Sequence, residues 1–201
     1  HLFYYNAFLI LSNGTEAKVG TLGSKYEFFH EWKRLSEQEQ GSVALETMLR
    51  GICKKENFLD LLENFILFDH SGGHTAKILA RNHQYLGVNE AIKAYEARKL
   101  NNGKLGVFWH TQGSGKSYSM VFLAQKIRRK FSGSPTIVIL TDRDELNTQI
   151  SDTFENCGIL GKAKASQFIA SSGDDLIDKL KGNPSFIFTL IQKFNKTDVE
   201  P

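Results

Sequence analysis

Hydrophobic and polar positions alternate between two patterns in the second half of the chain. Apolar residues at every third or fourth position predict helices, and short continuous apolar runs predict strands that are buried on both faces. The predicted helices cover residues 78–99, 117–130, 144–154 and 174–180, and the predicted strands cover residues 105–109, 136–141, 163–166 and 185–190. Strands separated by helices of this length are typical of an α/β domain in which helices flank a parallel sheet. Trp109 ends the first predicted strand and is expected in the core.

The first part of the chain has a different pattern. Residues 2–11 and 17–22 are rich in aromatic and β-branched side chains and flank an Asn-Gly step, so they predict a β-hairpin. Ser24 and Glu27 have the spacing of a capping box, which predicts a helix that ends near Leu35.

Two shorter helices are predicted at residues 44–52 and 58–65, where the apolar spacing is near 3.6. The segment 70–75 contains two consecutive glycines and is predicted to be a loop. We take this loop as the boundary between the N-terminal part and the α/β part of the chain.

The composition is that of an ordinary globular protein, since 41% of the 201 residues are hydrophobic and 23% are charged. This hydrophobic fraction, with a net charge of only +3, excludes a disordered chain. No apolar stretch approaches the ~20 residues that a membrane helix needs, so no membrane partner is predicted. Cys53 and Cys157 lie in no Cys-x-x-Cys pattern. Two lone thiols fit a reducing compartment, and we expect a cytoplasmic protein.

The chain starts with His1 rather than methionine, and its first residues have the pattern of a strand interior. We therefore expect an internal fragment of a longer protein.

Charge is distributed unevenly along the chain. Residues 1–69 carry 7 Lys/Arg and 10 Asp/Glu, whereas residues 70–201 carry 18 Lys/Arg and 12 Asp/Glu. The basic part is the expected place for a polyanionic partner, although an ordinary solvated surface explains the same asymmetry.

The most specific motif is Trp-His-Thr-Gln-Gly-Ser-Gly-Lys-Ser at residues 109–117, between a predicted strand and a predicted helix. Gly113 and Gly115 allow backbone N–H groups to approach a phosphate, and the helix N-terminus adds a partial positive charge. Lys116 is expected to reach the β- and γ-phosphates of a nucleotide, and the Ser117 hydroxyl to coordinate Mg²⁺. The strict motif has glycine at the position of His110.

Three alternatives remain open at this point. Asp142 follows the apolar run 137–140 and is a candidate Walker B acid of an unrelated, kinase-like P-loop enzyme. Residues 195–198 fit the Asn-Lys-x-Asp guanine-reading pattern of a GTPase, but they follow Gln192-Lys193-Phe194 rather than a strand. A non-enzymatic interaction scaffold is the third alternative.

Several motifs resemble those of one family, the R subunit of type I restriction enzymes, which are superfamily 2 translocases. Residues 109–117 are similar to the family's motif I, in which histidine replaces the first loop glycine. The segment Arg81-Asn-His-Gln84-Tyr resembles the family's Arg-x-His-Gln-Tyr segment, whose glutamine is placed to read adenine. Further resemblances are to motif Ia at residues 141–149, to motif Ib at residues 186–194, and to the segment joining nuclease and motor at residues 2–6, 20–22 and 31–33.

The resemblance implies an ATP-driven motor that pumps double-stranded DNA, with a nuclease domain and with methylation and specificity subunits as partners. It implies the end of the nuclease domain at residues 1–36, a helical connector at 37–72, and an incomplete first RecA-like domain without Walker B at 73–201. Glu16-Ala-Lys18 imitates a nuclease triplet but has no upstream acidic partner, so the nuclease carboxylates are expected elsewhere. We expect the fragment to bind ATP weakly and neither to hydrolyse it efficiently nor to cut DNA.

The site residues that follow fall into three groups. Lys116 and Ser117 are the catalytic candidates, and Ser117 is the candidate ligand of Mg²⁺. Arg143, Gln192 and Lys193 are candidate DNA contacts after predicted strands, with salt bridging as the alternative. The ATP-binding candidates are Arg81, Gln84, Thr111, Gln112, Gly113, Ser114, Gly115, Lys116 and Ser117.

Overall fold

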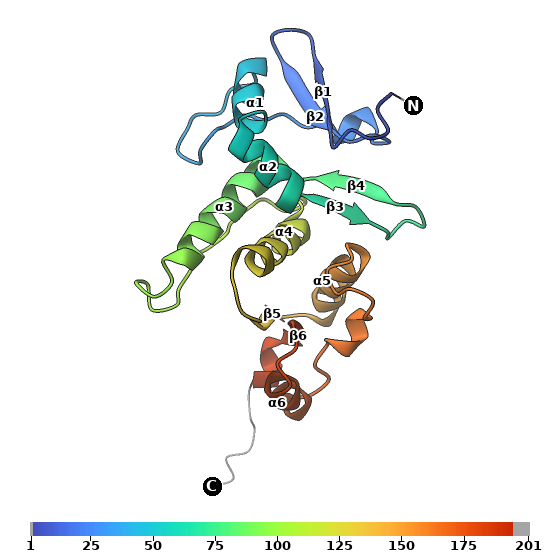
Figure 1. Cartoon of the computed structure of the whole chain (residues 1–201). Helices are drawn as coiled ribbons and strands as arrows, with labels where there is room; N and C mark the ends of the chain where they lie inside the picture. The colour runs from blue at the N-terminus through green and yellow to red at the C-terminus, as the bar shows by residue number, and fades with distance from the viewer. Residues whose placement is uncertain (1, 195–201) are drawn as a thin grey trace. The chain divides into compact units, whose positions relative to one another are not determined.

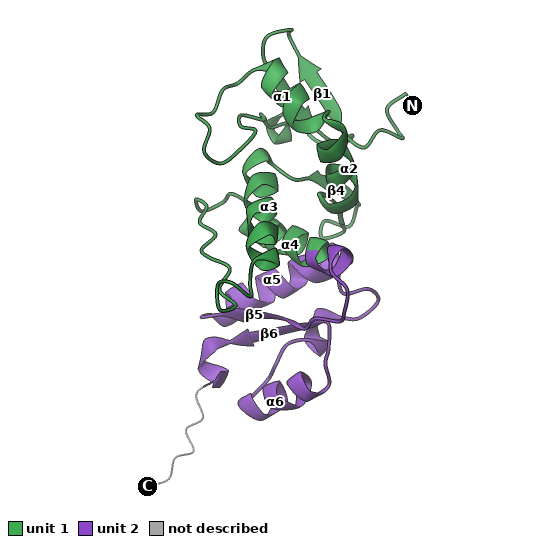
Figure 2. Cartoon of the chain, turned by 60° about the vertical axis from the view of Figure 1, so that its left-hand side comes forward, with its two compact units in different colours: residues 1–126 green, residues 127–201 purple. Residues whose placement is uncertain are grey.

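A computed structural model describes residues 2–194 of the chain (Figure 1). These residues form a mixed α/β structure that divides into two compact units, residues 1–126 and residues 127–201 (Figure 2). Within residues 2–194, no helix has the length and apolar character needed to cross a membrane. The Asn-Lys-x-Asp pattern at residues 195–198 lies outside the described part of the chain.

The predicted N-terminal hairpin forms, but its first strand is shorter than the predicted residues 2–11, because residues 2–5 are turns. Strands β1 (Leu9–Ser12) and β2 (Ala17–Gly20) pair antiparallel, with Leu9 opposite Gly20. The Asn13 side chain closes the turn, because its Oδ1 accepts from the backbone N–H groups of Thr15 and Glu16 at 3.0 and 2.8 Å. The β2 face carrying Ala17 and Val19 is buried.

The helix predicted from Ser24 to Leu35 is wrong. Only a single 3₁₀ turn, η1 (Tyr26–Phe28), forms there. His30 instead exchanges two backbone hydrogen bonds with Val19, at 2.8 and 2.9 Å, and this bridge holds the chain extended beside β2. Pairing with an existing strand therefore overrides the local capping pattern.

Helices α1 (Leu45–Ile52) and α2 (Lys55–Asn64) are close to the predicted ones. The sequence did not predict the hairpin that follows, in which β3 (Ile66–Asp69) pairs antiparallel with β4 (Ala76–Leu79). Residues 70–75 are a loop, as expected, and form the turn of this hairpin. The long helix predicted from residue 78 therefore starts only at Asn82, as α3 (Asn82–Glu96).

The core of the first unit lies between these helices and hairpins. Helix α4 (Lys116–Lys130) packs here with its N-terminal part. The Phe65 ring contacts the rings of both Tyr85 and Phe122, with centroid distances of 4.7 and 5.6 Å. The largest fully buried side chains of this unit are Val19, Trp32, Met48, Ile52, Leu61, Phe65, Val88 and Phe122.

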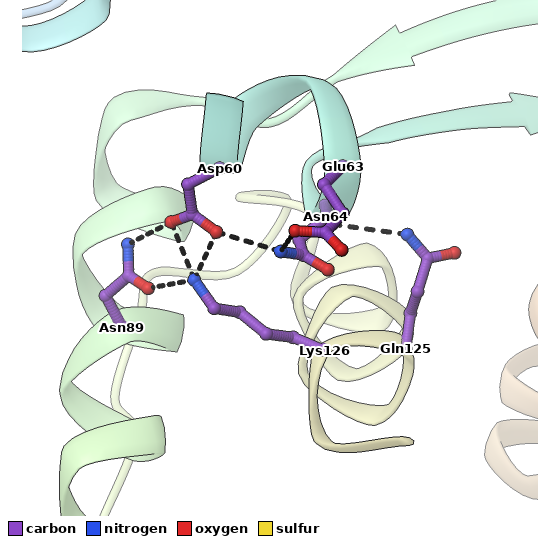
Figure 3. Close-up of polar contacts among 6 residues, drawn as sticks. All are labelled: Asp60, Glu63, Asn64, Asn89, Gln125 and Lys126. Atoms are coloured by element: carbon purple, nitrogen blue, oxygen red, sulfur yellow. Dashed lines mark hydrogen bonds and ion pairs between the residues drawn. The ribbon is translucent and has the colours of Figure 1, made fainter. Parts of the chain in front are cut away.

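The charged side chain of Lys126 is buried in this core, at the junction of α2, α3 and α4 (Figure 3). The Lys126 side chain is only 7% exposed, and its Nζ donates to both Asp60 carboxylate oxygens at 2.5 and 2.6 Å and to Asn89 Oδ1 at 2.6 Å. Asn64 Nδ2 donates to the same carboxylate at 2.9 Å. A buried cation satisfied in this way ties three helices together.

The predicted strand at residues 105–109 is wrong, and so is the placement of Trp109 in the core. Residues 105–109 pair with no other strand in the described part of the chain. Val107 and Trp109 are 95% and 78% exposed. A continuous apolar run predicts a buried strand only where neighbouring strands satisfy its backbone groups, and residues 2–194 supply none at this place.

The second unit contains a parallel strand pair, as predicted. Strand β5 (Ile137–Thr141) pairs with β6 (Phe186–Leu190). Helices α5 (Asp144–Asn156) and α6 (Gly173–Lys181) contact β6, where Phe154 packs on Phe186 and Phe188. The short strand predicted at residues 163–166 is wrong, because η2 (Ala165–Gln167) forms there and only Ile169 bridges to Phe188.

Candidate functional site: the phosphate loop and its cavity

The candidate phosphate loop, residues 110–117, leads directly into α4, whose first residue is Lys116. Gly113 and Gly115 have φ angles of +76° and +82°, in the left-handed region that L side chains rarely adopt. The two glycines thus turn the backbone immediately before the helix N-terminus, where N–H groups without intrahelical partners favour an anion.

Lys116 lies across the loop. Its Nζ donates to the carbonyl oxygens of His110 and Thr111 at 2.7 and 3.0 Å. The ammonium group is therefore held by exposed loop carbonyls, and it can exchange these acceptors for the oxygens of a phosphate.

The first turn of α3 holds the loop from the other side. Gln84 Nε2 donates to the carbonyl oxygen of Gly115 at 2.9 Å, and Gln84 Oε1 accepts from the Arg81 backbone N–H at 2.8 Å. His83 Nε2 lies 3.1 Å from the carbonyl oxygen of Ser114 and carries the proton there, because a carbonyl only accepts. Sequence reasoning did not place His83 at the loop, since its 31-residue separation from Ser114 has no local signal.

His110, the residue that departs from the strict motif, is half-buried beside these groups. Its ring meets His83 edge-on at a centroid distance of 4.6 Å and packs against Phe108 at 4.3 Å. Burial lowers the pKa of His110, and the nearby His83 and Lys116 lower it further. A neutral imidazole at this position carries no positive charge that would repel the Lys116 ammonium.

A second contact joins the start of α4 to the β3–β4 hairpin. The Tyr118 hydroxyl donates a short hydrogen bond to Asp69 Oδ2. Burial opposes ionisation of Asp69, but hydrogen bonds from Tyr118 and Ser71 outweigh it and hold the pKa of this carboxyl below its usual range. The ionised carboxylate therefore accepts the Tyr118 hydroxyl and holds the start of α4 next to β3.

A cavity of about 570 Å³ opens beside the loop, within the first unit. Its walls come from residues 20–25, from residues 74–79 of the β4 region, and from loop residues 113–115. Arg81, Gln84 and Tyr118 complete them, together with Phe28 and His30. The described residues that line it include Lys25, Lys77 and Arg81 but no carboxylate. This volume and sign of charge suit an anionic ligand the size of a nucleotide.

The residues at the loop fit a nucleoside triphosphate with Mg²⁺. Ser114 Oγ and His110 Nδ1 are buried at the loop without a hydrogen-bond partner among residues 2–194. Gly113, Lys116 and Ser117 follow closely on one another at the start of α4, so this segment carries backbone N–H groups, an ammonium group and a hydroxyl. Thr111 and Gln112 are exposed on the same loop.

The candidate DNA contacts lie in the second unit, after the carboxyl ends of β5 and β6. Gln192 Nε2 donates to the Asp142 carbonyl oxygen at 3.0 Å, which joins the two strand ends. Arg143 Nε lies 3.4 Å from the Asp142 carboxylate, and both side chains are largely exposed. Lys193 Nζ donates a short hydrogen bond to the Ala170 carbonyl oxygen.

The sequence is similar to endonuclease subunits of type I restriction enzymes. It is 37% identical over 99% of its length to the type I restriction enzyme HindI endonuclease subunit of Haemophilus influenzae. It is 30% identical over 97% of its length to a candidate MjaIXP endonuclease subunit of Methanocaldococcus jannaschii, and 24% identical over 97% to the SsaAORF53P subunit of Staphylococcus saprophyticus. The chain spans about a fifth of the length of these relatives, 20% in each case. These similarities confirm the resemblance seen in the motifs.

The sequence model of a protein family also matches residues 83–201, which is more than half of the chain. The matched region starts in the first turn of α3 and includes the phosphate loop and both strands of the parallel pair. From this match, the chain belongs to the SWI2/SNF2 ATPase family.

Proposed function

We propose that the chain forms part of the ATP-driven motor of a type I restriction endonuclease subunit. The observation that carries this proposal is the arrangement at the start of α4, where two left-handed glycines precede Lys116 and line a cavity in which no described lining residue is a carboxylate. The relatives named as endonuclease subunits support the type of enzyme.

In this proposal the loop binds the triphosphate and the cavity receives the rest of ATP. Lys116 moves from the loop carbonyls to the β- and γ-phosphates, and Ser117 coordinates Mg²⁺, which neutralises charge on the phosphates. Gly113, Ser114 and Gly115 provide backbone N–H groups, while Thr111 and Gln112 flank them. Arg81 and Gln84 face the nucleotide from α3.

The proposed polyanionic partner is double-stranded DNA, with Arg143, Gln192 and Lys193 as contacts to its backbone. Methylation and specificity subunits are the proposed protein partners. The proposed division is the end of a nuclease domain at residues 1–36, a connector at 37–72, and an incomplete RecA-like domain at 73–201. The pairing of β3 with β4 crosses the second of these boundaries.

Equilibrium binding of ATP·Mg²⁺ to the 201-residue chain tests the site. We expect Lys116→Ala to weaken binding at least tenfold, because a charge-assisted contact to phosphate is lost. Lys104→Ala removes the same charge from an exposed turn of the same unit and is expected to leave binding unchanged. ATP binding that is insensitive to Lys116→Ala would contradict the proposal and favour a scaffold.

ATP turnover and DNA cleavage are not expected of these 201 residues alone. They contain neither an Asp-Glu-x-His nor an Asp-Glu-x-Asp box. We expect no DNA-stimulated ATP turnover and no DNA cleavage by this chain. Turnover that is abolished by Asp142→Asn would instead identify Asp142 as the Walker B acid of a different P-loop enzyme.

A further inference from the structure

We infer that the turn at residues 20–25, together with Phe28, forms the wall that contacts the base of the bound nucleotide. These residues lie well before residue 83, where the match to the ATPase family starts. The inference rests on the proposed function, since it assumes that the triphosphate lies on the loop at residues 110–117. It adds a subsite built by the N-terminal segment.

The turn is held rigidly against the rest of the cavity. Thr21 is buried, and its Oγ1 donates to the Lys77 carbonyl oxygen on β4 at 2.6 Å. The hydroxyls of Thr21 and Ser24 are 2.7 Å apart, and the Ser24 N–H donates to the Thr21 carbonyl oxygen at 3.1 Å. The turn is therefore a preformed part of the cavity wall rather than a loose loop.

Part of the same wall is apolar. Leu22 and Phe28 line the cavity but remain 39% and 56% exposed, and Ile78 and Leu79 of β4 line it as well. Large apolar side chains that are exposed at a cavity, next to cationic residues, match a flat aromatic base attached to a phosphate chain. Once the loop holds the triphosphate, this wall is the apolar surface left for the base.

The other candidate for base contact is already engaged within the protein. Gln84 is only 3% exposed, and both ends of its amide are hydrogen-bonded, to Arg81 and to Gly115. The Gln84 amide can therefore contact only the edge of the base by hydrogen bonding. The flat faces of the base must contact other side chains. Phe28 and Leu22 provide that surface.

The 3₁₀ turn η1 offers a matched pair of variants. Phe28 lines the cavity, whereas Tyr26, two residues earlier and also exposed, does not. We expect Phe28→Ala to weaken ATP binding about tenfold, the scale of losing one base–aromatic contact, and Tyr26→Ala to leave it unchanged. Leu22→Ala should weaken ATP binding less, and its control is Leu11→Ala on the exposed end of β1.

Binding of inorganic triphosphate, which has no base, distinguishes the contribution of the base wall from that of the phosphate loop. Phe28→Ala and Leu22→Ala are expected to bind inorganic triphosphate like the wild type, whereas Lys116→Ala loses both ligands. The inference is overturned if both wall variants bind ATP like the wild type, or if they weaken ATP and inorganic triphosphate equally. Failure of the proposed function has a different signature, namely ATP binding that survives Lys116→Ala.

Discussion

The side chain of Gln84 holds the carbonyl oxygen of Gly115, at a distance of 2.9 Å, and so connects α3 to the phosphate loop. The same oxygen accepts from the Ser119 N–H at 3.1 Å, the hydrogen bond that opens α4. In a trans peptide the C=O and the following N–H point in opposite directions. Fixing the Gly115 carbonyl toward α3 therefore turns the Lys116 N–H away from α3.

Removing the Gln84 side chain tests this connection. We expect Gln84→Ala to lower the free energy of unfolding by about 1–3 kcal/mol, because the Arg81 N–H loses its bond to Gln84 Oε1 and the Gly115 carbonyl oxygen loses one of its donors. ATP binding should weaken as well. For stability alone, the control is Gln112→Ala, in an exposed position of the loop, which should change the free energy of unfolding by less than about 0.5 kcal/mol. Urea unfolding and ATP titration measure both effects.

Alanine variants of the two loop glycines distinguish the cost of backbone strain from the cost of a side-chain clash. A Cβ at Gly115 would lie 2.8 Å from Gln84 Nε2, whereas a Cβ at Gly113 meets no atom within 4 Å. Both have positive φ, so alanine at either position costs about 1–2 kcal/mol of strain. We expect Gly115→Ala to be the more destabilising of the two. Equal losses of stability would show that the contact with Gln84 contributes nothing.

The buried Lys126 should contribute far more to stability than a surface lysine. We expect Lys126→Met to cost about 3–5 kcal/mol, because the partly buried Asp60 carboxylate loses its cation. Lys93→Met breaks an exposed pair with Glu90, 2.7 Å long, and should cost less than about 1 kcal/mol. The double variant Asp60→Asn, Lys126→Met should recover part of the loss. Chemical denaturation curves with unchanged slopes provide the comparison.

His30 makes the stability of the chain dependent on pH. Burial, together with the positive charges of Arg81 and His83, lowers the pKa of His30 to about 4, although Glu31 opposes the shift. Since an unfolded histidine has a pKa of about 6.5, the unfolded state binds more protons between pH 6.5 and 4. Stability is therefore complete above pH 6.5 and falls by up to about 3 kcal/mol as the pH drops to 4.

His30→Gln should flatten the stability profile over this pH range relative to the wild type. The exposed His74, replaced by glutamine, is the control and should leave the profile unchanged. The assignment to His30 fails if the His30→Gln profile keeps the full slope between pH 6.5 and 4. Thermal unfolding in a series of buffers of constant ionic strength provides the measurement.

Local patterns in the sequence determined many of the elements. The hydrophobic periods predicted α4, α5, α6 and the parallel pair of β5 and β6 to within a few residues. The Asn-Gly step predicted the first hairpin, and the glycines with Lys116 marked the loop at the start of α4. These features depend on residues that are close in sequence, so their physics can be read locally.

The tertiary structure decided where local preferences compete with distant partners. The segment after Ser24 is extended because His30 pairs with Val19, and residues 105–109 are exposed because no strand within residues 2–194 lies beside them. The contacts of His83 and Gln84 with the loop, and the cavity wall from residues 20–25 and Phe28, join segments far apart in the chain. Such contacts form only when the distant segments have folded together, and no spacing in the sequence predicts them.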